Sequence, residues 1–95
     1  GLEPHPVLRL VIKEAEETVT RARISDKSPL VGKTLKDAQI PEETGMWVLA
    51  IRRGKECLRP RPETVIRAGD VLIASGYAEG EEDLKRLASG IPKQS

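Results

Sequence analysis

Two apolar runs, each entered through a glycine, constrain the fold of this chain more than any other feature. The first run spans Met46–Arg52 and follows Gly45, and the second spans Val71–Ser75 and follows Gly69. Short apolar runs bounded by turn residues predict β-strands. The first run is apolar at successive positions, so it predicts a central strand that is covered on both faces. A chain organised around two such strands is expected to form a small sheet.

A third strand and a hairpin complete the predicted sheet. Residues 18–25 alternate between two kinds of side chain, which predicts a strand with one solvent-exposed face. The inward set is Thr20, Ala22 and Ile24, and the outward set is Val19, Arg21 and Arg23. Arg53-Gly54-Lys55 predicts a hairpin turn, and residues 56–59 are the expected return strand before the prolines that follow.

Three segments have helical spacing. Residues 6–17 predict a leader helix, because Pro6 suits a first helical turn and apolar residues then recur on one face. Thr34 and Asp37 form a capping box, and the short helix after it is expected to end before Pro41. The last helix is expected from about Ala78 to a stop at Gly90, with Leu84, Leu87 and Ala88 as its buried stripe.

The composition limits the class of protein. The 95 residues suffice for one domain. Hydrophobic residues make up 38% and Phe is absent, so the core is thin, and we expect a second chain or domain to complete it. A formal net charge of +1 gives no general attraction to nucleic acid. Cys57 is the only cysteine, which excludes a disulfide framework and favours a reducing cytoplasm. No apolar run reaches membrane-spanning length, so direct membrane insertion is not expected.

The sequence offers no catalytic constellation. Gly32-Lys33-Thr34 looks like the end of a phosphate-binding loop, but Lys27 stands where that loop requires a glycine. His5 is the only histidine, so neither a His-based triad nor a multi-His metal site can form within one chain. We therefore expect no enzyme activity, no metal site and no cofactor.

Basic residues crowd the hairpin and the loop after it, and they leave two interpretations open. Their guanidinium groups could hold an anion through bidentate hydrogen bonds, or the charges could solubilise the hairpin and pair with Glu56 and Glu63. Asp70 is expected to accept hydrogen bonds from nearby backbone donors. The basic cluster consists of Arg52, Arg53, Lys55, Arg59, Arg61 and Arg67.

Trp47 and Cys57 also need interpretation. Trp47 begins the first central strand, where it either packs in the core or anchors an interface. Cys57 is expected to be a small buried residue rather than a reactive thiol. Trp47 and Tyr77 are the only aromatic residues, so a stacking platform for nucleic acid is not expected.

The order and spacing of these segments resemble the C-terminal regulatory domain of potassium-uptake proteins, called TrkA-C or RCK-C. The likeness runs from about Thr18 to Ala88 and rests on the turns at Gly32, Gly45, Pro60 and Gly69-Asp70. It implies an α+β fold, with a mostly antiparallel sheet of about four strands flanked by helices. Residues 18–90 would form this domain, residues 1–17 a leader helix or linker from an upstream domain, and residues 91–95 a tail. The leader would suit a connection from a helical PhoU-like domain.

The resemblance implies a non-catalytic, cytoplasmic regulatory domain of a potassium or other cation transport system. Such domains form homodimers, sense ligands, and work on a cation channel or transporter subunit through the full-length protein, at the periphery of the membrane. Some relatives bind cyclic di-AMP at the dimer interface. The alternative is a purely structural homodimerisation module with no small-molecule ligand.

The matching ligand region in this chain is Ile40, Pro41, Met46–Trp47 and the loop around Pro60, to which the basic cluster adds Arg52 and Arg61. Relatives that bind cyclic di-AMP tend to carry an arginine in place of Pro41 and a small polar residue in place of Trp47. The ligand class therefore stays open between a cyclic dinucleotide and another anion.

Overall fold

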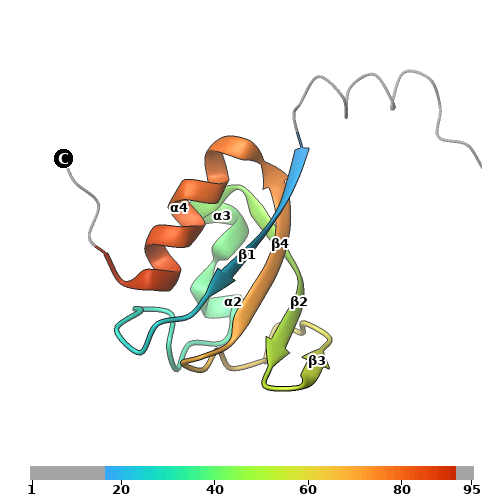
Figure 1. Cartoon of the computed structure of the whole chain (residues 1–95), viewed down its shortest axis with the longest axis vertical. Helices are drawn as coiled ribbons and strands as arrows, with labels where there is room; N and C mark the ends of the chain where they lie inside the picture. The colour runs from blue at the N-terminus through green and yellow to red at the C-terminus, as the bar shows by residue number, and fades with distance from the viewer. Residues whose placement is uncertain (1–16, 92–95) are drawn as a thin grey trace, which may run out of the picture.

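The computed structural model describes residues 17–91, which form a four-stranded sheet with helices on one of its faces (Figure 1). The predicted leader helix and most of the predicted tail lie outside the described residues. Glu17, which was expected in the leader, belongs to the first strand. The elements in chain order are β1 (Glu17–Arg23), α2 (Leu35–Ala38), α3 (Ile40–Thr44), β2 (Met46–Arg53), β3 (Glu56–Leu58), β4 (Val71–Tyr77) and α4 (Ala78–Ser89).

The sheet has the strand order β1-β4-β2-β3, and every neighbouring pair is antiparallel. The two glycine-led apolar runs are therefore the central strands, as predicted. The alternation of β1 is confirmed, because Thr20 and Ala22 are buried while Val19 is 64% exposed. Arg53 pairs with Glu56 across the hairpin. A tight turn of this kind requires a positive φ, and Gly54 supplies it at 60°.

One helix was not predicted from the sequence. The α2 helix follows its capping residue as expected, with Thr34 Oγ1 accepting a hydrogen bond from the Asp37 N–H at 3.1 Å. Pro41 was expected to close the helical segment, but it lies in the first turn of a second helix, α3. Proline is tolerated there because its missing N–H would have no partner in a first turn. Gln39 takes a left-handed φ of 50° between the two helices, so the chain changes direction before Pro41.

The core lies between the sheet and the helices. Its buried side chains come from all the helices, from β1, β2 and β4, and from the loop residues Ile24, Leu30 and Ile66. The other face of the sheet has no helix over it within residues 17–91 (Figure 1). The prediction that β2 is covered on both faces is therefore wrong for this chain on its own, because Trp47 and Leu49 of β2 are 64% and 52% exposed.

Two glycines allow the end of α3 to lie close to α4 and to β4. A Cβ atom added to Gly80 in α4 would lie 2.2 Å from the Thr44 carbonyl oxygen, and one added to Gly76 in β4 would lie 2.4 Å from the Gly45 carbonyl oxygen. Thr44 closes this junction by donating to the Ile40 carbonyl oxygen at 2.7 Å and accepting from the Met46 N–H at 3.0 Å. The junction fixes the start of β2 against α3.

Candidate functional site

A hollow of about 500 Å³ opens beside the first half of β2, between α2, α3 and the proline-rich loop after β3. It exists because β3 pairs only with the last residues of β2, Ile51–Arg53, which leaves the outer edge of the first half without a neighbouring strand. The walls are mostly apolar and basic groups stand at the rim. The lining residues are Leu35, Lys36, Ile40, Pro41, Glu42, Trp47, Val48, Pro60, Arg61 and Pro62.

The floor of the hollow is buried, whereas its indole wall is exposed. Ile40 is only 1% exposed and starts α3, and Val48 packs partly against the core. Trp47 is 64% exposed, because strand alternation turns it away from the core while its neighbours Met46 and Val48 turn inward. An aromatic wall beside a fixed apolar floor is typical of small-molecule sites.

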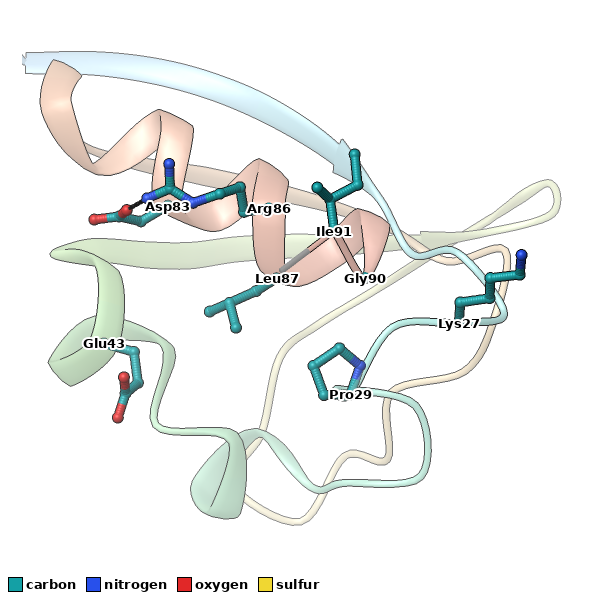
Figure 2. Close-up of a pocket in the computed structure, with 8 residues that line it drawn as sticks. All are labelled: Lys27, Pro29, Glu43, Asp83, Arg86, Leu87, Gly90 and Ile91. Atoms are coloured by element: carbon teal, nitrogen blue, oxygen red, sulfur yellow. Dashed lines mark hydrogen bonds and ion pairs between the residues drawn. The ribbon is translucent and has the colours of Figure 1, made fainter. Parts of the chain in front are cut away.

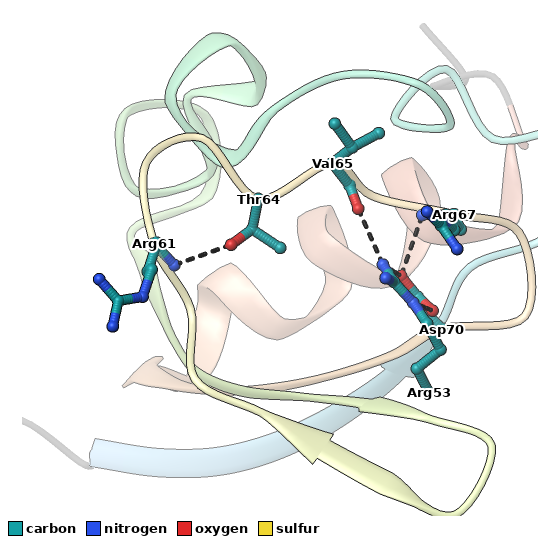
Figure 3. A network of polar contacts seen from close by, with 6 residues as sticks. All are labelled: Arg53, Arg61, Thr64, Val65, Arg67 and Asp70. Atoms are coloured by element: carbon teal, nitrogen blue, oxygen red, sulfur yellow. Dashed lines mark hydrogen bonds and ion pairs between the residues drawn. The ribbon is translucent and has the colours of Figure 1, made fainter.

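Three charged side chains line the hollow. Lys36 and Arg61 bring positive charge, and Glu42 brings negative charge. All three residues are exposed. Arg61 belongs to a turn in which its N–H donates to Thr64 Oγ1 at 3.1 Å, and its guanidinium points away from that turn (Figure 3). The guanidinium has no hydrogen-bond or ion-pair partner among the described residues, so it can offer its donors to an anion.

Another arginine of the basic cluster has a structural role. Arg53 donates two hydrogen bonds to the buried carboxylate of Asp70, from Nε to Oδ1 and from Nη2 to Oδ2, each 2.9 Å long (Figure 3). Arg53 Nη2 also donates to the Val65 carbonyl oxygen at 2.8 Å, and the Arg67 N–H donates to Asp70 Oδ2 at 2.9 Å. The prediction that Asp70 caps a backbone donor is confirmed. The network joins the end of β2, the proline-rich loop and the start of β4.

Two opposing effects act on the pKa of Asp70. Burial raises the pKa of this carboxyl, whereas the Arg53 hydrogen bond, the Arg67 N–H and the two positive charges lower it, and the net result lies below the ordinary value. The same hydrogen bond raises the pKa of Arg53 above its ordinary value. The pair is therefore charged at neutral pH, and Nε and Nη2 of Arg53 donate to Asp70 and to the Val65 carbonyl oxygen. Arg53 does not line the hollow beside β2.

The structure brings together four of the six predicted site residues. Ile40, Trp47, Pro60 and Arg61 all line the hollow, and Pro41 of the matching region does so as well. Met46 does not, because it is fully buried with no exposed surface and cannot touch a ligand in this conformation. Arg52 lies outside the lining, opposite Val71 of β4 on the uncovered face of the sheet. Whether the lining residues bind a ligand stays a prediction.

Sequence reasoning missed other lining residues and misplaced one side chain. Leu35 and Lys36 belong to the hollow, although the capping box indicated only a helix start there. Cys57 was expected to be buried, but it is exposed. It lies opposite Arg52 in the register of the hairpin, on the face that no helix covers. Trp47 is likewise not a core residue, which leaves the interface interpretation for it.

A second hollow of about 520 Å³ lies between α4, α3 and the loop around Lys27 and Pro29, and it is a weaker candidate for binding (Figure 2). Arg86 and Asp83, both on its wall, form an ion pair with each other. Leu87 points into the space from α4, and Lys27 and Glu43 stand at opposite sides of it (Figure 2). Because the guanidinium of Arg86 is already paired with Asp83, this hollow is a weaker candidate for an anion site than the hollow beside β2.

The described residues place two limits on the chemistry. Residues 17–91 contain no group of three or more His, Cys, Asp or Glu side chains that could hold a metal ion. In the same residues no helix combines the length and apolar character needed to cross a membrane.

Comparison with known proteins identifies related sequences. Potassium channel protein 1 of Methanocaldococcus jannaschii is 41% identical over 83 residues, which are 86% of this chain and 25% of that protein. The chain thus spans about a quarter of the length of this curated relative.

Solved structures of RCK-C domains share the fold. The RCK C domain of the potassium transport protein KtrA, in complex with c-di-AMP, is 29% identical with a TM-score of 0.63, over 86% of this chain and 92% of that one. The RCK_C domain dimer of S. agalactiae BusR, in complex with c-di-AMP, is 23% identical with a TM-score of 0.68, over 73% of this chain and 92% of that one. The four-stranded α+β fold expected from the sequence is confirmed.

The model of the TrkA-C domain family matches residues 19–89. This range begins within β1 and ends with the last residue of α4, so it contains both the sheet and the hollow beside β2. The chain belongs to the TrkA-C (RCK-C) family of regulatory domains.

Proposed function

We propose that this chain is the ligand-sensing, dimerising and non-catalytic regulatory domain of a cytoplasmic part of a potassium or other cation transport system. The observation that carries the proposal is the hollow beside β2, which has mostly apolar walls and is also lined by the basic residues Lys36 and Arg61. A domain of this kind would act on a channel or transporter subunit in the full-length protein. The potassium channel relative supports the transport system, and the match to TrkA-C domains supports the regulatory role.

The proposed ligand is a small anion with an aromatic or apolar part. The RCK-C domains of KtrA and BusR have been solved with c-di-AMP, which supports a cyclic dinucleotide as the first candidate for this chain. The hollow suits such a molecule, since about 500 Å³ lies within the usual range of ligand sites. Trp47 would stack on a base, and Lys36 and Arg61 would contact phosphate oxygens. Pro41 contributes no charge, so Arg61 and Lys36 carry most of the anion recognition.

The ligand can be tested by calorimetry and thermal unfolding. Purified protein would be titrated with cyclic di-AMP, cyclic di-GMP, AMP and inorganic phosphate. A true ligand stabilises the folded state by roughly 3 kcal/mol at a hundredfold excess over its dissociation constant. Arg61→Gln should weaken binding about tenfold or more, because it removes one charge-assisted contact. Arg59→Gln is the matched control, since Arg59 is also an exposed loop arginine but does not line the hollow.

The alternative function is a structural homodimerisation module without a ligand. The uncovered face of the sheet favours this alternative, because its exposed apolar side chains could be buried in a dimer without any ligand. Failure of all four compounds to bind, or an equal loss of affinity in Arg61→Gln and Arg59→Gln, would contradict the sensing proposal and favour this module. That the chain does not bind nucleic acid stays a prediction, and the same titration with single-stranded DNA would test it.

A further inference from the structure

The charged side chains around the hollow beside β2 come from two separate walls. One wall is formed by the start of α2 and the proline-rich loop, which backbone hydrogen bonds tie together. The Lys36 N–H donates to the Pro62 carbonyl oxygen at 3.0 Å, and the Leu35 N–H donates to the Thr64 carbonyl oxygen at 2.9 Å. These hydrogen bonds hold the backbone of Lys36 beside the loop that carries Arg61, so the two basic residues belong to the same wall.

The second wall is formed by α3 and the start of β2, and it carries the carboxylate of Glu42 and the indole of Trp47. The Gly45 N–H closes α3 by donating to the Pro41 carbonyl oxygen at 2.8 Å, and β2 begins at the next residue. The left-handed turn at Gln39 separates α3 from α2. The acidic residue of the hollow and its basic pair therefore lie on different elements.

Glu42 has no role within the described part of the chain that would explain its place in the hollow. It is exposed, and among residues 17–91 its carboxylate has no hydrogen-bond or ion-pair partner. Glu43 is exposed in the same helical turn but lines the other hollow. The preference of helix starts for acidic residues applies to both glutamates equally. A carboxylate in an anion site, however, repels the ligand unless it accepts a hydrogen bond from it.

We infer that Glu42 determines which anions the hollow selects, by accepting a hydrogen bond from an amino group of the ligand. This inference rests on the proposed function and deepens it. The phosphate of the ligand would lie against Lys36 and Arg61. The base would stack on Trp47 and present its amino group to Glu42. The ligand class is therefore a nucleotide whose base carries an exocyclic amine.

Glu42 would discriminate between bases by attraction and by repulsion. A carboxylate only accepts hydrogen bonds, so it attracts an amine and repels a base that presents a lone pair at the same place. A site that hydrogen-bonds one group of its ligand rejects the analogue without that group, and the rejection is strongest where the site is buried. Because Glu42 is exposed, water compensates part of the loss, and we expect a preference of about tenfold.

Calorimetric titration of the 95-residue chain with two matched nucleotides tests the inference. AMP carries an amine on its purine ring, and purine riboside 5′-monophosphate has a hydrogen in its place. The wild type should bind AMP about tenfold more tightly. Glu42→Ala should lower this ratio to about one, because no acceptor for the amine remains. Glu43→Ala is the matched control and should leave the ratio at about tenfold. The ratio cancels any general effect of losing one negative charge, and circular dichroism shows whether each variant is folded.

Several outcomes would overturn the inference. They are equal affinity of the wild type for both nucleotides, a ratio that Glu42→Ala leaves unchanged, and a ratio that both alanine variants lower equally. Failure of both AMP and cyclic di-AMP to bind would overturn it as well. Arg61→Gln separates the inference from the proposed function, because it should weaken both nucleotides alike. If the wild type binds the two nucleotides equally and Arg61→Gln weakens both, the role of Glu42 is wrong and the sensing proposal stands.

Discussion

Replacing Asp70 with asparagine should destabilise the fold by about 3 kcal/mol at neutral pH. The carboxylate is 1% exposed and accepts three hydrogen bonds, two from Arg53 and one from the Arg67 N–H. Breaking a buried ion pair by changing one partner typically costs 3–5 kcal/mol. The Arg53 side chain is 28% exposed, so water can hydrate its guanidinium once the carboxylate is gone. The expected loss of stability is therefore near the lower end of that range. Asparagine keeps one acceptor oxygen but sets an NH₂ group against donors of Arg53.

The effect should depend on pH with a defined sign. The folded protein holds the pKa of Asp70 below its ordinary value of 3.8. A carboxyl whose pKa is lowered on folding stabilises the protein above its unfolded pKa, and that contribution disappears as the pH falls through the folded pKa. The difference in unfolding free energy between wild type and Asp70→Asn should therefore be constant from neutral pH to about pH 5 and shrink below about pH 4.

Urea denaturation followed by circular dichroism at several pH values provides the measurement. Trp47 fluorescence would be a poor probe, because the indole is already 64% exposed in the folded chain. Asp26→Asn is the control, since Asp26 is exposed and should change the unfolding free energy by less than about 0.5 kcal/mol. A loss below about 1 kcal/mol for Asp70→Asn at neutral pH, or a loss that persists unchanged in acid, would refute the assigned role of the pair.

Two further predictions concern contacts that fasten the helices. Gly80→Ala should lower the unfolding free energy by about 1–3 kcal/mol despite the better helix propensity of alanine, because the new Cβ would meet the Thr44 carbonyl oxygen at 2.2 Å; an increase in urea midpoint would show that α3 moves aside easily. Ser28→Ala should lower the unfolding free energy by about 1–2 kcal/mol in the same assay. Ser28 is 6% exposed, and its hydroxyl donates to the Leu87 carbonyl oxygen at 2.5 Å and accepts from the Leu30 N–H at 3.1 Å. An unchanged unfolding free energy would mean that water replaces both contacts.

The strands could be predicted from the sequence because their alternation is local. Period-two patterning placed β1, and the glycine-led apolar runs placed β2 and β4. The apolar run did not show that one face of β2 is open, because successive apolar residues predict cover on both faces. The α3 helix could not be predicted in this way. Pro41 ends a helix when it follows one and opens a helix when a turn precedes it, and the deciding feature is the left-handed Gln39. A positive φ at a glutamine has no sequence signal.

The candidate site was predictable only in part, for a similar reason. The lining residues Ile40, Trp47 and Pro60 could be placed by the family resemblance, and Arg61 was added from the basic cluster. Arg52 and Arg53 looked equivalent to Arg61 in the sequence. They differ in the structure for two reasons. Strand pairing directs Arg52 to the open face of the sheet, and Arg53 pairs with Asp70, which lies 17 residues away along the chain. Long-range pairing of this kind is decided by the fold and is not visible in residue spacing.

Trp47 and Leu49 break the rule that makes the rest of this chain consistent. Most apolar positions of the strands turn toward the helices or are half-buried, but Trp47 and Leu49 of the central strand β2 are 64% and 52% exposed, as are Val19 of β1 and Tyr77 at the end of β4, at 64% and 55%. Local departures from good folding patterns concentrate where a protein binds something. Here the departures coincide with the free edge of β2, the rim of the hollow and the middle of the open face. The thin core and the exposed strand are therefore two features that the proposed dimerisation would account for together, because a domain of this size buries a limited share of its surface on its own.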